Sequence, residues 1–250
     1  MAGDKSLSPH LLGARVVTGA QRSPTAVAAK ARSLVAELGA LDAALYGLDQ
    51  VWRGLAGHGL LYRYELVAQA VAERPRLGAR RGASIETRRL GPGDPALAEL
   101  PLDDAVLAAR FAQGAVCLGA FKGGRTIGCL WFVPGAYEED EVRCRFVPEG
   151  AAAWDFDLYL APEVRGGLGF ARLWDAADAA YREAGIGWSM SRISRFNAAS
   201  LAAHKRAGAR RLGRATYVVL GPLQIMVATL PPYLHLGVRS RPVLRLVAPE

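Results

Sequence analysis

Hydrophobic and polar residues alternate most regularly between residues 154 and 160. The alternation predicts a strand with Trp154, Phe156, Leu158 and Leu160 on one face and Asp155, Asp157 and Tyr159 on the other. Pro162 ends this strand, because proline cannot donate a ladder hydrogen bond. Apolar residues then recur at helical spacing from Phe170 to Ala184, which predicts a helix ending at Gly185.

Between this strand and this helix lies the turn Arg165-Gly166-Gly167-Leu168-Gly169. Glycines let backbone N–H groups approach a phosphate, and the dipole of the following helix favours negative charge at its N-terminus. The pattern therefore indicates an anion-binding turn. Glycine turns also join strands to helices without binding anything, so both interpretations stay open at this point.

Hydrophobic periodicity divides the rest of the chain into four parts. Residues 1–23 have no apolar stripe and are interpreted as a disordered tail. Two amphipathic helical patterns and one strand at 60–71 form an N-terminal helical extension, residues 24–83, which ends in a Pro/Gly/Arg-rich linker. Its stripes (Leu41, Leu45, Leu48, Trp52 and Leu55 in the second helix) predict packing against the main domain or a partner. The main domain spans residues 84–230, and residues 231–250 form a C-terminal tail.

The main domain is expected to be of mixed α/β (α+β) class. Strands at 85–90, 116–121 and 126–133 precede the central strand, and the glycine pair Gly123-Gly124 predicts a hairpin between two of them. A strand at 188–193, a helix capped by Asn197 and a final hairpin over residues 210–230 follow. This order predicts a largely antiparallel central sheet flanked by helices.

Composition narrows the class of protein. Half of the residues are hydrophobic, 22% are charged and the net charge is +8, so an acidic partner is favoured. No apolar run reaches the ~20 residues of a membrane span. The basic residues form no dense block with interleaved aromatics, which argues against a nucleic-acid-binding protein. The three cysteines lack disulfide or metal-ligand spacing, so a reducing, cytoplasmic location and no metal are expected.

Two motifs resemble those of the GNAT superfamily of N-acyltransferases. The first is Leu158-x-Leu160-x-Pro162-x-x-Arg165-Gly-Gly-x-Gly, which is similar to the acyl-CoA pyrophosphate-binding signature. The second is Asn197-x-x-Ser200-x-x-x-His204-Lys-Arg-x-Gly208, which is similar to the second helix motif of the family. Two departures stand out: the turn glycines are shifted relative to the usual Arg/Gln-x-x-Gly-x-Gly/Ala, and His204 replaces a tyrosine.

The resemblance implies a GNAT-like fold, an acetyl-CoA or longer acyl-CoA cosubstrate, and a set of binding residues. These are Leu158, Leu160, Arg165, Gly166, Gly167, Gly169, Phe170 and Asn197. It also implies that His204, at the tyrosine position, protonates the leaving thiolate. Asp155 and Asp157 lie on the expected polar face of the central strand, and Asp157 is preferred as the base. The alternative for Asp157 is a structural ion pair with Arg143, Arg145, Arg192 or Arg195.

These observations predict an acyltransferase that moves an acyl group from an acyl-CoA, or from an acidic acyl carrier protein, to a small-molecule or peptide amine. The alternative is a degenerate GNAT fold that binds acyl-CoA or a protein partner without turnover, since the turn spacing and the missing tyrosine depart from the family pattern. A homodimer is left open. The sequence does not reveal the acceptor, because acceptor pockets in a given fold are built from variable loops.

Overall fold

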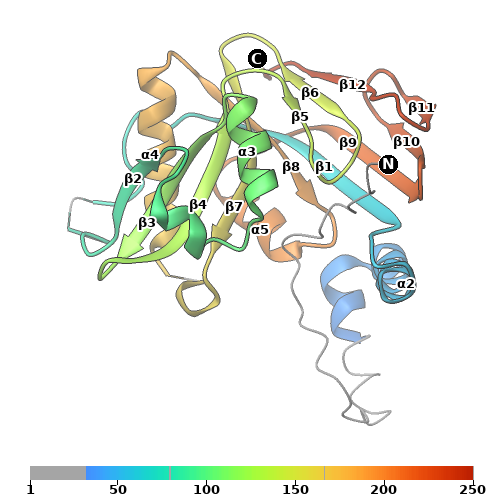
Figure 1. Cartoon of the computed structure of the whole chain (residues 1–250), viewed down its shortest axis with the longest axis horizontal. Helices are drawn as coiled ribbons and strands as arrows, with labels where there is room; N and C mark the ends of the chain where they lie inside the picture. The colour runs from blue at the N-terminus through green and yellow to red at the C-terminus, as the bar shows by residue number, and fades with distance from the viewer. Residues whose placement is uncertain (1–31, 79, 166, 250) are drawn as a thin grey trace.

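The computed structural model describes residues 32–78, 80–165 and 167–249 (Figure 1). The predicted tail at residues 1–23, the start of the first predicted helix and Gly166 lie outside the described residues. The helices are α2 (Ala40–Ala56), α3 (Asp104–Ala112), α4 (Gly169–Glu183) and α5 (Ala198–Arg206), with residues 32–38 also helical and short 3-10 turns at η1 (Pro95–Glu99) and η2 (Pro162–Val164). The strands are β1 (Leu61–Ala70), β2 (Glu86–Leu90), β3 (Val116–Lys122), β4 (Arg125–Val133), β5 (Tyr137–Glu138), β6 (Arg145–Pro148), β7 (Ala152–Leu160), β8 (Trp188–Ser194), β9 (Arg210–Leu220), β10 (Leu223–Ala228), β11 (Leu234–Gly237) and β12 (Val243–Leu246).

The described strands form a nine-stranded sheet in the order β11-β10-β9-β1-β8-β7-β4-β3-β2. Every neighbouring pair in it is antiparallel except β7 and β8, which are parallel and joined by α4. The β3–β4 hairpin turns at Gly123 and Gly124, whose φ angles of 57° and 76° suit the tight turn predicted from the glycine pair. The mixed, largely antiparallel sheet confirms the predicted fold class.

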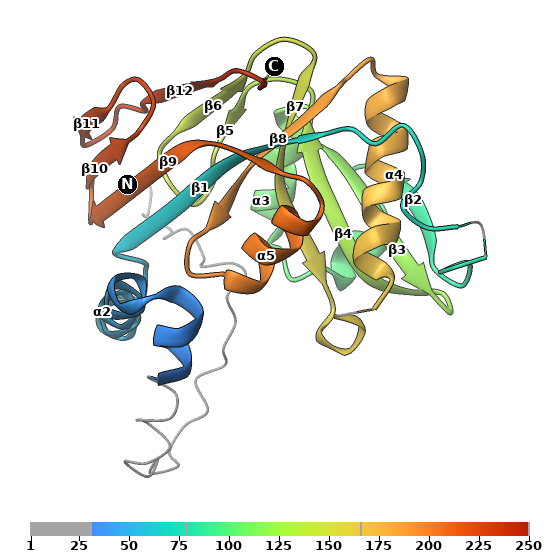
Figure 2. The same cartoon turned by 180° about the vertical axis from the view of Figure 1, so that it is seen from behind.

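The strand predicted within the N-terminal extension is β1, and it lies in the middle of the sheet. It pairs with β8 on one side and with β9 on the other (Figure 2). The sheet of the domain predicted at residues 84–230 is therefore continued by a strand from residues 24–83. Two strands from the predicted tail also pair: β11 extends the large sheet, and β12 joins β6 and β5 in a small second sheet.

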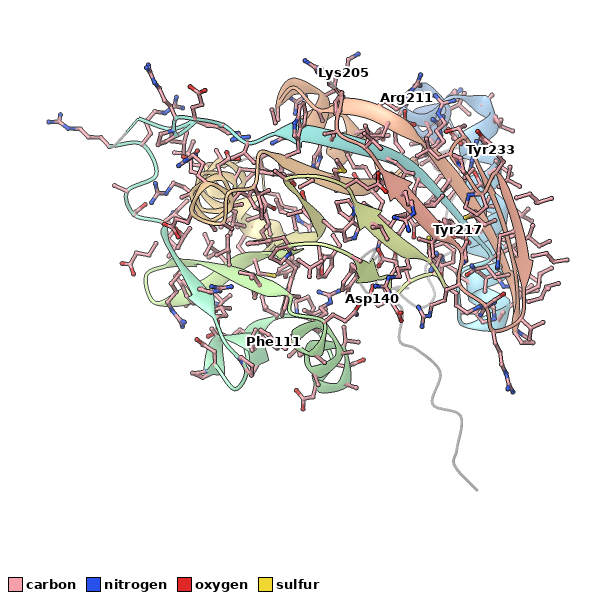
Figure 3. The ribbon with its side chains drawn as sticks, turned by 90° about the horizontal axis from the view of Figure 1, so that it is seen from above. Phe111, Asp140, Lys205, Arg211, Tyr217 and Tyr233 are labelled. Carbon is pink, nitrogen blue, oxygen red and sulfur yellow. The ribbon has the colours of Figure 1, made fainter. Side chains whose placement is uncertain are left out.

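Each face of the large sheet carries its own hydrophobic core. On one face, α4 packs with Leu173, Trp174, Ala177 and Tyr181 buried, which are members of the predicted apolar stripe. On the other face, α3 and the small sheet cover a second core, in which Phe146 stacks on Trp154 with ring centroids 4.2 Å apart. Figure 3, viewed along the sheet, shows Phe111 of α3 on one side and Lys205 of α5 on the opposite side. We call these the α3 face and the α4 face.

The predicted alternation along β7 holds only as far as Phe156. Trp131 of β4 faces Asp157, but the next residue, Phe132, faces Asp155, so Phe156 is the extra residue of a β-bulge. The bulge reverses which side later residues occupy. Trp154 and Phe156 pack into the core on the α3 face, whereas Leu158 and Leu160 pack with α4. The prediction of one shared face for these four residues is wrong, because a bulge breaks the period of two.

Helix α2 is amphipathic, but its buried side chains are Asp42 and Asp49. Leu41, Leu48 and Leu55, from the stripe expected to pack, are 66%, 55% and 81% exposed. Leu45 and Trp52 of the same stripe are partly buried. The stripe is therefore only partly packed on the described chain, and packing of its exposed leucines against a partner stays a prediction. None of the helices in the described ranges is long and apolar enough to cross a membrane.

Candidate active site between strands β7 and β8

Strands β7 and β8 pair only over their first four residues, Ala152–Asp155 with Trp188–Ser191. Beyond this point β7 continues along β4 to Leu160, and β8 continues along β1 to Ser194. The two parallel strands thus part, and their carboxyl ends lead to the first turns of α4 and α5 (Figure 2). In sheets with parallel strands, ligand sites form where neighbouring strands lead in different directions.

The glycine turn joins the end of β7 to α4. Arg165 holds the turn closed, with its Nε donating to the Leu160 carbonyl at 3.0 Å, and the Gly167 amide donates to the Val164 carbonyl at 3.2 Å. Gly169 is buried as the first residue of α4, and a Cβ there would lie 3.1 Å from Leu160 Cδ2. The helix therefore starts very close to the strand because Gly169 has no side chain.

The N-terminus of α4 has no capping side chain among the described residues. Leu168 at the cap provides no side-chain hydrogen bond, and no acidic residue lies in the first helical turn of the described chain. When a helix start has neither a capping side chain nor an acidic residue, its backbone N–H groups attract anions. The predicted phosphate-binding residues Arg165, Gly167 and Gly169 therefore suit a phosphate group, and their role stays a prediction. In α5, by contrast, the side chain of Asn197 accepts from the Ser200 amide at 3.0 Å, as the predicted N-cap should.

The remaining predicted binding residues line the side of β7 that faces α4. Leu160 is buried, and Leu158 and Phe170 are partly buried against the same core. The Phe170 ring lies with its centroid 6.1 Å from that of His204, in an edge-to-face arrangement. The structure therefore brings His204 and the start of α4 together, as the two motifs predicted.

His204 is held as a neutral imidazole. Its Nδ1 lies 2.9 Å from the Ser200 carbonyl, which can only accept, so Nδ1 carries the proton. Burial lowers the pKa of His204, and the hydrogen bond to Ser200 offsets part of that effect. At neutral pH the other nitrogen, Nε2, is therefore an unprotonated acceptor. The predicted role of proton donor stays a prediction that now requires a pH below the ordinary pKa of histidine.

Asp157 lies on the other face of the sheet, where it pairs with Arg110 of α3. The distance from Arg110 Nη1 to Asp157 Oδ2 is 2.8 Å, and Nη2 of the same guanidinium lies 2.9 Å from Asp140. Burial raises the pKa of Asp157, and the charge of Arg110 limits the rise. The alternative of a structural ion pair is thus realised, but with a helix arginine and not with Arg143, Arg145, Arg192 or Arg195.

Arg192 of β8 forms a second set of ion pairs beside the first. It donates from Nε and Nη2 to both oxygens of Glu139, at 2.6 and 2.8 Å, and its Nη2 also lies 2.9 Å from Glu141. Burial raises the pKa of Glu139 to about 7 despite these bonds. Burial alone would raise the pKa of Asp140. A hydrogen bond with the Glu139 side chain and the charge of Arg110 outweigh this effect and lower the pKa of Asp140 to about 2.

Tyr137 adds an unused hydroxyl to this cluster. The residue is 1% exposed and stacks on Phe156 with ring centroids 4.1 Å apart, while the Arg110 guanidinium lies 5.1 Å from the same Phe156 ring. Its hydroxyl has no hydrogen-bond partner among the described residues. Burial, and after it the charges of Asp140 and Glu139, raise the pKa of Tyr137. We call the six charged residues and Tyr137 the arginine–carboxylate cluster: Arg110, Tyr137, Glu139, Asp140, Glu141, Asp157 and Arg192.

The second aspartate of β7, Asp155, lies on the α4 face and not beside Asp157. It is 5% exposed and accepts a 2.9 Å hydrogen bond from the Ser189 hydroxyl. Burial raises the pKa of Asp155 to about 7. The bulge at Phe156 therefore separates two carboxylates that the sequence pattern placed on one face.

Most of the arginine–carboxylate cluster was missed from the sequence. Arg110 lies among apolar residues of α3 and is buried together with Leu107. A buried arginine needs a carboxylate partner, because an unpaired buried charge is costly. The acidic run Glu138 to Glu141 was the available signal for that partner. Nothing in the spacing of these segments shows that they meet at β7. Across the described parts of the chain, no group of side chains could hold a metal ion.

Similarity to known proteins is found only among solved structures, at low identity. No protein-family model and no curated protein matches the chain. Among solved structures, the chain is similar to an aminoglycoside acetyltransferase from an uncultured soil metagenomic sample, with 15% identity over 50% of this chain and 88% of that chain and a TM-score of 0.37. It is also similar to a GCN5-related N-acetyltransferase from Sphaerobacter thermophilus (14% identity, 66% of this chain, 53% of that chain, TM-score 0.42). A third similar structure is a PaiA N-acetyltransferase from Thermoplasma acidophilum in complex with coenzyme A. It has 18% identity over 49% of this chain and 87% of that chain, with a TM-score of 0.35.

The order of strands and helices from β2 to β10 follows the order predicted from the sequence, with hairpins before and after the β7-α4-β8-α5 segment. Identities of 14 to 18% and TM-scores of 0.35 to 0.42 decide nothing about donor or acceptor. The function is therefore argued below from the residues of the site.

Proposed function

We propose that the protein is an N-acyltransferase that moves an acyl group from an acyl thioester, acetyl-CoA or a longer acyl-CoA, to an amine. One observation supports this most directly: the glycine turn and the uncapped start of α4 lie where β7 and β8 part. That arrangement offers donors to a pyrophosphate on the α4 face, while the arginine–carboxylate cluster lies at the same parting on the α3 face.

The donor side of the site binds by position and charge. The Gly169 amide at the start of α4 and the guanidinium of Arg165 would hold the pyrophosphate, with Gly167 leaving room for its approach, and the apolar Leu158 and Phe170 would contact the pantetheine arm. A thioester fixed in this way needs little further activation, because proximity to the acceptor supplies a large part of the rate. An acidic acyl carrier protein is the second donor that the net charge of +8 favours.

The acceptor side favours a cationic amine. Four carboxyl groups of the cluster face two guanidinium groups, so the cluster attracts positive charge. Asp140 and Glu141, at 27% and 36% side-chain exposure, are its accessible members. The unpartnered hydroxyl of Tyr137 would accept from, or donate to, the bound acceptor.

The reaction moves one proton from the amine to the departing sulfur. The amine nitrogen forms a bond to the thioester carbonyl carbon, the carbon–sulfur bond breaks, and the amide and a free thiol result. Asp157 would take the proton from the amine directly or through water, since burial raises its pKa and brings it nearer to that of an effective base. His204, on the α4 face, is the proposed donor to the thiolate.

Release of free thiol tests the proposal. The full-length protein is incubated with acyl-CoA and acyl-carrier donors of several chain lengths and with pooled amines, and thiol is followed by a colorimetric reagent. Thiol release that depends on the amine supports the proposal. Donors consumed no faster than without protein, with every amine class tested, contradict it.

Donor binding is tested separately by calorimetry with CoA. Gly167→Val should weaken binding by about ten-fold or more, because a side chain there blocks backbone approach to phosphate. A matched control is Gly91→Val, at an exposed loop glycine with nothing within 4 Å of its Cβ position. The control should bind CoA as the wild type does. Equal affinity in all three proteins would remove the turn from the site.

A second candidate is a GNAT-like protein that binds an acyl thioester without turnover. The observation in its favour is that both predicted catalytic groups are engaged: Asp157 with Arg110, and His204 with its own helix. This candidate predicts CoA affinity that Gly167→Val abolishes together with no thiol release from any donor.

A further inference from the structure

Helix α2 presents a continuous apolar stripe to solvent. Leu41, Leu48, Val51 and Leu55 are 66%, 55%, 63% and 81% exposed, and with Ala44 they follow one another at intervals of three and four residues. This is the spacing of a helix that pairs with another helix along a narrow seam. Figures 1 and 2 show α2 at the rim of the molecule, away from α4.

The outward orientation of the stripe is fixed by polar contacts on the opposite side of α2. Asp49 accepts from the backbone amides of Leu60 and Leu61 at 2.9 and 3.0 Å. Asp42 lies 2.6 Å from Arg195 and also pairs with Arg63. Rotating α2 to bury its leucines would leave these two aspartates without partners, which is strongly destabilising for a buried charge. The helix is therefore held with its apolar side outward.

Two glycines lie beside the stripe. Gly47 and Gly54 stand inside the helix, where glycine is less favourable than alanine. No described atom comes within 4 Å of the position where either Cβ would be. Their lack of a side chain serves no packing within the described chain, but it keeps the flank of the stripe flat for a neighbouring helix.

We propose that this stripe is the interface of a homodimer, in which two α2 helices pair antiparallel around a two-fold axis at Leu48. A two-fold interface must be self-complementary. The stripe meets this requirement: under that axis Leu41 faces the partner's Leu55, Leu45 faces the partner's Val51, Ala44 faces the partner's Trp52, and Leu48 faces its own copy. This symmetry favours a second copy over an unrelated protein. The dimer is independent of the proposed acyltransferase activity.

The area available fits a modest dimer. The four exposed side chains, with the partly buried Leu45 and Trp52, offer roughly 600 Å² per copy and about 1,200 Å² in total, the lower end of specific interfaces. The stripe contains no charged residue, so two copies meet without charge repulsion. We therefore expect a reversible dimer with a dissociation constant in the micromolar range or below.

Sedimentation of the full-length protein between about 1 and 100 µM tests the dimer. The wild type should dimerise, and Leu48→Glu should weaken association at least a hundred-fold, because two buried glutamates would face each other on the axis. Gln50→Glu is the matched control, since it adds the same charge to an exposed position of the same helix away from the stripe. Thermal melts of both variants should match the wild type at monomeric concentrations. A wild type that stays monomeric throughout the range overturns the proposal, and so does Leu48→Glu with unchanged association.

Cysteine cross-linking tests the orientation. Under mild oxidation, Leu48→Cys should form a disulfide between copies, whereas Gln50→Cys should not. Leu41→Cys and Leu55→Cys should cross-link poorly alone and well when mixed, because each faces the other across the axis. The native Cys117, Cys129 and Cys144 are buried and should not react. Efficient cross-linking of Leu41→Cys with itself would show a parallel pair and overturn the two-fold arrangement. Association with no cross-link at Leu48 places the interface elsewhere and overturns it as well.

Discussion

The two faces of the sheet differ sharply where β7 and β8 part. On the α3 face every charge of the arginine–carboxylate cluster has a partner inside the chain, through Arg110 and Arg192. On the α4 face the start of α4 presents amide donors without any acidic or capping side chain. The α3 face thus carries an internally paired cluster with two more carboxyl groups than guanidinium groups, whereas the start of α4 favours an added anion. This difference supports our proposal that the phosphate-bearing donor binds on the α4 face and the acceptor on the α3 face.

The largest expected effect follows from removing one arginine of the arginine–carboxylate cluster on the α3 face. Arg110→Ala should lower the free energy of unfolding by about 3–5 kcal/mol, because it leaves Asp157 buried without its counter-charge. Urea denaturation measures this loss. The double variant Arg110→Met, Asp157→Asn should regain at least half of it, since neither charge is then buried.

The matched control for this change is Arg245→Ala. Arg245 is 68% exposed and pairs with Glu149 at 3.1 Å. Exposed ion pairs contribute at most ~1 kcal/mol, so the control should unfold nearly as the wild type does. Equal losses in the two variants would mean that the α3 face is as solvated as the surface.

A smaller effect distinguishes the buried carboxylate of the α4 face. Because the pKa of Asp155 is raised to about 7 when folded, its protonated form stabilises the native state below that pH. This contribution is lost as the pH rises through about 7. Between pH 5 and pH 8 the wild type should therefore lose about 2 kcal/mol relative to Asp155→Asn, measured by denaturation at each pH. Parallel pH profiles for the two proteins would show that Asp155 is solvated.

The smallest effect concerns His204. If the imidazolium protonates the thiolate, His204→Ala should lower turnover about ten-fold at pH 6, or ~1.4 kcal/mol of barrier. Since burial lowers the pKa of His204, the proton is lost as the pH rises, and the deficit should shrink toward pH 8. His204→Tyr should restore part of the activity and flatten the profile. A deficit that is independent of pH would reduce His204 to a packing residue beside Phe170.

Local patterns predicted the fold well, because they depend on neighbours in sequence. The stripe of α4 from Leu173 to Tyr181, the cap at Asn197 and the glycine hairpin at Gly123 each follow from residues a few positions apart. The position of β1 between β8 and β9 could not be predicted in this way, since its partners lie roughly 120 to 160 residues later. Strand order depends on contacts that no local pattern records.

The candidate site was predicted only in part, for the same reason. The glycine turn and His204 come from two motifs and do lie together across Phe170. The bulge at Phe156 left no trace in the alternation, and it placed Asp155 and Asp157 on opposite faces. The sequence pattern also did not show that α2 is held on the sheet by its aspartates, through Arg195 among others, with Leu41, Leu48 and Leu55 left exposed.

The central position of β1 also sets the order in which the sheet can assemble during synthesis. Strands β2, β3, β4 and β7 find their partners soon after they are made, whereas β1 must wait for β8 and β9. At 5–20 residues per second the ribosome needs roughly ten seconds to bridge that gap. During this time Leu66, Ala68 and their apolar neighbours, fully buried in the finished sheet, are without their strands. We expect the nascent chain to need protection at β1 until the last third has emerged.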